Sequence, residues 1–164
     1  TVGSGYDSLT FGADLGELGS TATFDMSAGG NNTIVAGSSA AYSSGSIVYT
    51  GGSGEDSLTF GTYLAAFSGT ATFDLGDDTA ADIVTFQGSI GESGGTVAIR
   101  NFNFNHDTID VAAGVSATTG EITDAAGDLT WTDSGGEHTI VFEEIGTGGA
   151  GVVATATQLI ADII

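Results

Sequence analysis

The chain of 164 residues has almost no basic side chains. Arg100 is its single Lys or Arg, against 21 acidic residues, and the formal net charge is −20. Nucleic acid and anionic membrane surfaces would be repelled by such a chain, so neither is expected as a partner. Ion pairs cannot relieve the repulsion among so many carboxylates, whereas bound divalent metal or high external salt can. The composition therefore predicts that the partners of this chain include cations.

Cysteine and proline are absent too, so no disulfide stabilises the chain, and repeats or metals would have to do so. No stretch is long and apolar enough to cross a membrane, and no membrane insertion is expected. The opening TVGSGYDSLT has neither the basic start nor the apolar core of a signal peptide. Since the first residue is not Met, we expect a processed chain or a fragment. The 28 glycines follow no Gly-X-Y period, which favours many tight turns over collagen.

One sequence segment occurs twice, as GSGYDSLTFG at residues 3–12 and as GGSGEDSLTF at residues 51–60. A shift of 49 residues aligns the two without a gap, and the same shift superposes the identical TATFD segments at 21–25 and 70–74. A weaker third copy, NHDTIDV, opens at residue 105. Internal repetition at such a period is typical of solenoids and other repeat arrays.

A finer period runs inside this repeat, because an Asp or Asn recurs about every 25 residues, at Asp7, Asn32, Asp56, Asp82 and Asp107. Each begins or precedes a short alternation of apolar and polar residues rich in Thr, Val, Ile and Phe, which is the pattern of a β-strand. The sequence therefore predicts an all-β fold, a parallel β-solenoid or β-roll-like stack of coils of about 25 residues.

Two connections in the predicted stack, ADLGELGS and TYLAAFSG, carry paired apolar residues. We expect each to form a short helical turn that packs Leu15 with Leu18, and Leu64 with Phe67, against the coils. 

The pattern changes near residue 112. We predict that the array occupies 1–111, with units 1–49 and 50–98 and a partial unit 99–111, and that 112–164 forms a C-terminal cap. Within the cap, GDLTWT and HTIVFEEI flank a Gly-Gly turn and predict a β-hairpin, followed by the apolar end ATATQLIADII.

The segment GGSGEDSLTF matches the RTX nonapeptide Gly-Gly-x-Gly-x-Asp-x-apolar-x, a β-helix repeat that binds Ca²⁺. IRNFNFNHDTIDV, at 99–111, is similar to the segment that follows RTX arrays, and the hairpin with TQLIADII resembles their C-terminal region. The resemblance implies a bacterial protein exported by type I machinery that reads an uncleaved C-terminal signal. It also implies folding outside the cell, at millimolar Ca²⁺.

The chain departs from that family because each nonapeptide stands alone instead of in tandem, so the family's two-sided calcium site cannot be carried over. Ca²⁺ takes six to eight oxygen ligands, more than one Asp supplies. The repeated Asp residues can either bind metal or set tight turns by accepting hydrogen bonds from their own backbone. DLGDDTAAD, at 74–82, is the best single local metal candidate, although its residues favour a solvated acidic loop slightly over a metal site. The candidate Ca²⁺ ligands are Asp7, Asp56, Asp74, Asp77, Asp78, Asp82, Asp107 and Asp110.

No catalytic group is expected. GESGG, around Ser93, fits the Gly-x-Ser-x-Gly nucleophile elbow, but a strand-like segment follows it where the elbow requires a helix. The two histidines, His106 and His138, have no partner in a metal or catalytic motif and are expected at the surface.

The sequence therefore favours a non-enzymatic structural protein, extracellular or on the cell surface. We expect it to fold with Ca²⁺ and to assemble through β-edges into a homo-oligomer, filament, surface layer or biofilm matrix. The alternative is a C-terminal calcium-binding secretion and folding module of a larger secreted hydrolase or adhesin.

Overall fold

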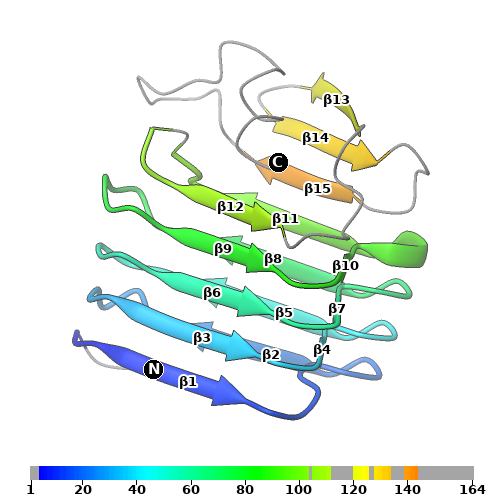
Figure 1. The fold of residues 1–164 in the computed structure, drawn as a ribbon, viewed down its shortest axis with the longest axis horizontal. Helices are drawn as coiled ribbons and strands as arrows, with labels where there is room; N and C mark the ends of the chain where they lie inside the picture. The colour runs from blue at the N-terminus through cyan, green and yellow to red at the C-terminus, as the bar shows by residue number, and fades with distance from the viewer. Residues whose placement is uncertain (1–3, 104, 112–119, 126–127, 134–138, 144–164) are drawn as a thin grey trace.

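The computed structural model describes residues 4–103, 105–111, 120–125, 128–133 and 139–143. In these ranges the chain is all-β and winds into coils that lie one on top of the next (Figure 1). Neighbouring coils are one strand spacing apart, about 4.8 Å. The described residues form no helix long and apolar enough to span a membrane. The predicted parallel β-solenoid is thus confirmed.

Each complete coil contributes one strand to each of three sheets. The front sheet of Figure 1 runs in the order β1 (Asp7–Phe11), β3 (Asn32–Ala36), β6 (Ser57–Phe60), β9 (Ile83–Phe86) and β12 (Thr108–Val111). The short edge sheet contains β4 (Ser39–Ala40), β7 (Tyr63–Leu64) and β10 (Ser89–Ile90). The back sheet begins with β2 (Thr21–Asp25), β5 (Ser46–Thr50), β8 (Thr70–Asp74) and β11 (Thr96–Arg100).

The register of the front sheet follows the period of the sequence. Asp7 pairs with Asn32, while Thr33 pairs with Ser57 and Ser57 with Ile83, so equivalent positions of successive coils lie side by side. Every pair of neighbouring coil strands in the three sheets is parallel. The repeat therefore specifies the register as well as the strands, because a slip of one residue would turn the apolar side chains outward.

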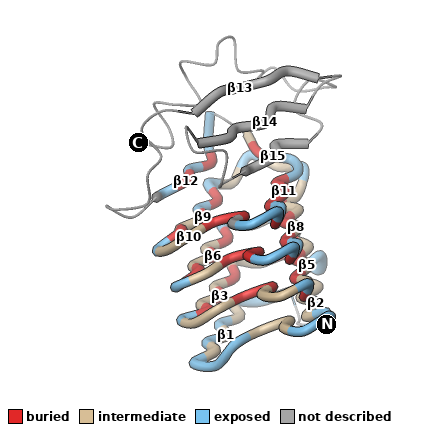
Figure 2. Tube along the Cα trace, turned by 90° about the vertical axis from the view of Figure 1, so that its right-hand side faces the viewer, coloured by how far each residue is buried: buried red, intermediate tan, exposed pale blue. Residues whose placement is uncertain are grey.

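The core lies inside the coils, and buried and exposed residues alternate along the strands (Figure 2). Phe60 of β6 is representative: its ring stacks on that of Phe73 across the coil, with centroids 4.8 Å apart, and on that of Phe86 in the next coil, at 6.4 Å. Burial of such inward rows stabilises each coil through its neighbours, as expected for a solenoid.

Strands after the array extend the back sheet. β15 (Thr139–Glu143) pairs in parallel with β11 and antiparallel with β14 (Asp128–Asp133), so the two strands of the predicted hairpin are confirmed. Their connection, 134–138, and the apolar end of the chain lie outside the described residues. A third strand, β13 (Gly120–Ala125), pairs antiparallel with β14 and was not predicted.

The prediction of helical turns in the two connections is wrong. Leu15 and Leu64 do point into the stack, but Leu18 and Phe67 are 80% and 47% exposed. Both have left-handed backbone conformations, with φ of 51° and 53°, which end any helical path and turn the side chain outward. Each corner between the edge sheet and the back sheet repeats this left-handed geometry, with Ser43 and Ser93 at the equivalent positions.

Candidate functional site

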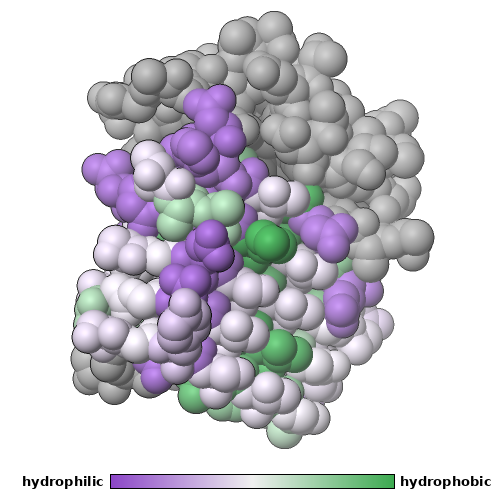
Figure 3. Space-filling model, turned by 60° about the vertical axis from the view of Figure 1, so that its left-hand side comes forward, coloured by the Kyte–Doolittle hydropathy of each residue, from purple (hydrophilic) through white to green (hydrophobic). Residues whose placement is uncertain are grey.

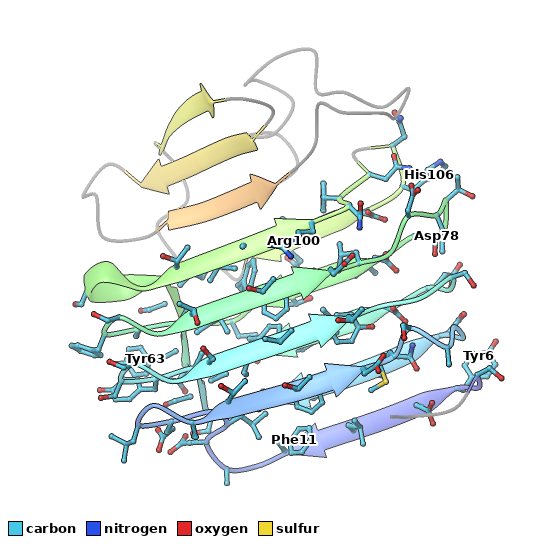
Figure 4. All side chains as sticks on the ribbon, turned by 180° about the vertical axis from the view of Figure 1, so that it is seen from behind. Tyr6, Phe11, Tyr63, Asp78, Arg100 and His106 are labelled. Carbon is cyan, nitrogen blue, oxygen red and sulfur yellow. The ribbon has the colours of Figure 1, made fainter. Side chains whose placement is uncertain are left out.

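One polar residue per coil forms a column along the corner where the back sheet leads into the front sheet. We call Asp7, Asn32, Asp56, Asp82 and Asp107 the aspartate column. A Gly-rich or polar turn precedes each position, and a front-sheet strand begins at the residue itself or at the next one. In Figure 4, Tyr6, Asp78 and His106 mark this edge of the stack, and Tyr63 marks the opposite edge.

Hydrogen bonds connect the column from coil to coil. The backbone N–H of Asn32 donates to Oδ1 of Asp56 at 2.9 Å, that of Asp56 donates to Oδ1 of Asp82 at 2.8 Å, and that of Asp82 donates to Oδ1 of Asp107 at 3.1 Å. Each carboxyl therefore satisfies a backbone donor that lies just before the ladder of the front sheet. The donor in each case belongs to the preceding coil, so this link differs from a turn in which Asp accepts a hydrogen bond from its own neighbouring backbone.

Three of the four carboxyls of the column are deeply buried. Asp56, Asp82 and Asp107 are 1%, 2% and 7% exposed, which is rare for Asp and costly unless the group is hydrogen-bonded. Oδ2 of Asp56 accepts a hydrogen bond from the Tyr49 hydroxyl at 2.6 Å, and Oδ2 of Asp107 accepts one from the backbone N–H of Asn103 at 2.7 Å. These donors offset part of the desolvation cost.

Burial dominates the ionisation of these groups. The pKa of Asp82 is raised to about 8, chiefly by burial and also by the negative charges of Asp107 and Asp56, against the lowering effect of the Asp56 N–H. Burial also raises the pKa of Asp56 and that of Asp107, although their hydrogen-bond donors lower it. The pKa of Tyr49 is raised as well, first by burial, so its hydroxyl remains a donor. The column thus favours protons or other positive charge.

In the first two coils the column contains oxygens that accept no hydrogen bond. Oδ2 of Asp7 and Oδ1 of Asn32 are both buried atoms without a partner, and the two residues are register partners in adjacent strands. The amide of Asn32 donates instead to Oδ1 of Asp56 and to the Gly30 carbonyl, both at 2.9 Å. Two acceptors without donors fit a cation better than another acceptor.

The four acidic residues of the loop at 74–82 have three different environments in the structure. Asp74 and Asp78 form turns in which the carboxylate accepts the backbone N–H two residues on, from Gly76 at 3.2 Å and from Ala80 at 2.6 Å. Asp77 is exposed, and Asp82 belongs to the column. Oδ2 of Asp78 is buried and unpartnered.

Asp110, the last candidate ligand, is exposed on β12. In the described part of the chain, no three acidic or histidine side chains are grouped so as to hold a metal ion.

Sequence reasoning located the column but missed the residues that donate to it. The Asp period is visible in the chain, whereas Tyr49 reads only as an apolar position of the strand SIVYT. Ser93 lies exposed in a left-handed turn of η1 (Glu92–Gly94), directly before strand β11, and His106 is exposed beside Asp107. His138 lies outside the described residues.

The fold and the column together define a class of protein, a parallel β-solenoid with buried acidic residues stacked along one corner. No protein-family model matches the chain, and neither does any curated protein or solved structure.

Proposed function

We propose that the chain is a non-enzymatic extracellular structural protein whose coils stack when positive charge, supplied by Ca²⁺ or by protons, neutralises the aspartate column. A surface layer, a filament or a biofilm matrix would be the assembled product. The observation that carries the proposal is the burial of Asp56, Asp82 and Asp107, one above another, in a chain with a single Lys or Arg. Stacked carboxylates repel one another unless their charge is reduced, so folding becomes coupled to the ionic conditions.

Ca²⁺ suits the donor atoms of the first coils. Oδ2 of Asp7 and Oδ1 of Asn32 are hard oxygen ligands that accept no hydrogen bond from the protein. Bound there, the ion would supply positive charge at the open end of the column. Other oxygens, from water or from backbone carbonyls, would have to complete a shell of about six to eight ligands.

A structural role rather than catalysis is favoured by how the polar groups are used. The carboxyls of Asp56, Asp82 and Asp107 accept hydrogen bonds that join coils, and those of Asp74 and Asp78 close turns. These carboxyls stabilise the stack through the hydrogen bonds that they accept, which favours a structural role for them.

The test is a titration of the purified chain from EGTA to millimolar Ca²⁺, followed by far-UV circular dichroism and by sedimentation, with Mg²⁺ as the control ion. We expect β signal and larger species to increase with Ca²⁺ at concentrations typical of extracellular calcium modules, about 10⁻⁴–10⁻³ M. A chain that is equally folded and equally assembled in EGTA would show the calcium proposal to be wrong.

A matched pair of variants identifies the site. Asp7→Asn removes a charge next to the unpartnered oxygen of Asn32, and should raise the Ca²⁺ concentration at the midpoint. Glu55→Gln removes one charge from an exposed side chain beside the column and should leave the midpoint unchanged.

A second candidate is a secretion and folding module of a larger extracellular protein. It is favoured by the first coil, whose apolar side chains are less covered than their equivalents inside the stack. The mass of the mature secreted product separates the two, since a species of 16.1 kDa would favour a self-standing subunit.

A further inference from the structure

At two glycines of the first coil, the described residues leave enough space for a side chain. A Cβ added to Gly5 or to Gly12 would meet no atom within 4 Å, and neither residue has the positive φ that favours glycine. Glycine costs conformational entropy, about 0.5–1 kcal/mol relative to Ala in a regular element. Glycine at these two positions would be explained by a neighbouring backbone that lies close to them, and the first coil has none on its outer side.

The third coil, which repeats the first at a shift of 49 residues, shows what that environment is. The second and fourth coils are more permissive at the position of Gly12, where Gly37 has only an ordinary 3.7 Å contact and Gln87 carries a side chain. Gly54, the equivalent of Gly5, would place a Cβ 2.5 Å from the carbonyl oxygen of Gly30, and Gly61, the equivalent of Gly12, would place one 2.5 Å from that of Gly37. In both cases the carbonyl belongs to the preceding coil. Gly5 and Gly12 are therefore suited to a further coil stacked on the outer side of β1.

The apolar side chains of the first coil agree with this. Phe11 and Phe24 are only partly buried, with ring centroids 5.5 Å apart, whereas their repeat equivalents Phe60 and Phe73 are 2% and 0% exposed. The same contrast holds for Leu9, Leu15 and Ala22 against Leu58, Leu64 and Ala71. In Figure 3, apolar (green) side chains reach the surface at the lower end of the stack, where β1 lies.

One corner does not fit a regular coil. Gly45 and Gly69 are required at the corner between the edge and back sheets, because their Cβ atoms would lie 1.4 Å and 1.7 Å from the carbonyl oxygens of Gly16 and Ala41 in the preceding coil. The first coil has Ser20 at this position, so a Cβ is present where Gly45 and Gly69 have none, and its hydroxyl donates to the Glu17 carbonyl of the same turn. An added coil must therefore follow a different path at this corner.

We propose that the outer side of the first coil, made by Gly5, Leu9, Phe11, Gly12 and Phe24, binds a parallel β-coil with small and aliphatic inward side chains. The template for this partner is the second coil of the chain, residues 29–51, which covers the equivalent face of the third coil. The partner pairs with β1 and β2 but diverges at Ser20. This inference goes beyond the proposed function, because the occupant it names is a partner coil other than a second copy of the chain.

The probe is a synthetic peptide of residues 28–52, added to the full chain in Ca²⁺ and in EGTA. Hydrogen exchange of the β1 and β2 amides measures coil addition separately from the response of the circular dichroism to Ca²⁺. We expect the peptide to protect both strands. A control peptide with Ile34→Lys and Ile47→Lys, both buried positions, should not.

Two variants of the chain test the fit. Gly12→Ala should not lower the melting temperature, because the Cβ meets nothing, and should weaken peptide binding at least about tenfold, or about 1.4 kcal/mol. Ser20→Gly should strengthen binding, because it removes the side chain at the obstructed corner.

Equal binding by wild type and Gly12→Ala, or no protection by the peptide, would overturn the proposal. Protection of β1 that rises with chain concentration in the absence of peptide would identify a second copy of the chain as the occupant, and would overturn the assignment of a separate coil. In either case a Ca²⁺-dependent folding signal would remain as an independent result.

Discussion

The backbone N–H of Asp56 donates to the carboxyl of Asp82 in the next coil, at 2.8 Å, and the N–H of Ile83 donates to the carbonyl of Asp56, also at 2.8 Å. The two coils are therefore joined twice at this point, once through backbone and once through a side chain. The side-chain link extends the ladder of the front sheet beyond the end of the strand. Because that acceptor is an ionisable group, the cohesion of the stack depends on its charge.

Stability should therefore fall as the solution becomes alkaline. The pKa of Asp82 is about 8 in the folded chain against an ordinary value of 3.8, because burial disfavours the charged form. Between these two values the folded state keeps a proton that the unfolded chain has lost, so the free energy of unfolding decreases as pH rises from about 4 to about 8. Each such pH unit corresponds to about 1.4 kcal/mol per proton. Urea unfolding across this range in EGTA measures the slope. A flat profile, or one that rises with pH, would contradict the role of the column.

Asp82→Asn should reduce this pH dependence. The amide is a neutral analogue of the protonated carboxyl, and its Oδ1 can still accept the N–H of Asp56. Asn32 shows that the column accommodates an amide, whose Nδ2 donates to Oδ1 of Asp56 at 2.9 Å. We expect the variant to be at least about 1 kcal/mol more stable than wild type near the alkaline end of the range, and closer to it in acid.

The matched control is Asp77→Asn, which removes one charge from an exposed residue. It should leave the slope with pH in place, so equal slopes for both variants would argue against a specific role of Asp82.

Tyr49→Phe should destabilise the stack by about 1–3 kcal/mol. Tyr49 is 1% exposed, and its hydroxyl donates to Oδ2 of Asp56 at 2.6 Å, so the variant leaves a buried oxygen without its donor. The loss should be larger in alkali, where Asp56 carries more charge. Thermal unfolding monitored by circular dichroism measures it.

Tyr42→Phe controls for the loss of a hydroxyl, because the Tyr42 ring packs against Tyr63 and Phe67 through its aromatic face and edge. Its effect should stay within about 0.5 kcal/mol. Equal effects of the two substitutions would mean that the Tyr49 hydroxyl does not support the column.

The repeat made the coils predictable, because the spacing from Asp7 to Asn32 and Asp56 sets the coil length and the alternation in DSLTF and NTIV sets which side chains face inward. The function of the column was not predictable to the same degree. A carboxyl that bonds to the preceding coil looks, in sequence, like one that closes its own turn. Tyr49 carried no polar signal at all, since Tyr is common in buried strands.

The corners were mispredicted for a different reason. Leu15 and Leu18 have the spacing of neighbours on a helical turn, as Leu64 and Phe67 do, and that spacing favours one apolar face. In the stack, the carbonyl groups of each corner lie close to the backbone of the next coil. The left-handed conformations of Leu18 and Phe67 allow the chain to turn in this way. Tertiary packing decided the conformation against local preference.

Gly69→Ala should destabilise the chain by about 3 kcal/mol or more. The added Cβ would lie 1.7 Å from the carbonyl oxygen of Ala41, a backbone atom that cannot move without separating the two coils. Gly37→Ala is the control, since its Cβ would meet the Phe11 carbonyl oxygen at an ordinary 3.7 Å and its φ is not positive. Denaturant midpoints compare the two. Similar midpoints would show that the coils are not in close contact at this corner.

Ser68→Gly should stabilise the chain by about 0.5 kcal/mol. Ser68 has φ of 62°, a conformation that costs a residue with a Cβ about 1–2 kcal/mol, and this saving exceeds the entropy cost of glycine, about 0.5–1 kcal/mol. The repeat supports the substitution, because the equivalent residues of the first and fourth coils are Gly19 and Gly94, with φ of 79° and 83°. Ser8→Gly, in the exposed part of strand β1, controls for the entropy term alone and should lower stability. If both variants lose stability equally in urea unfolding, the corner at Ser68 is not left-handed in solution.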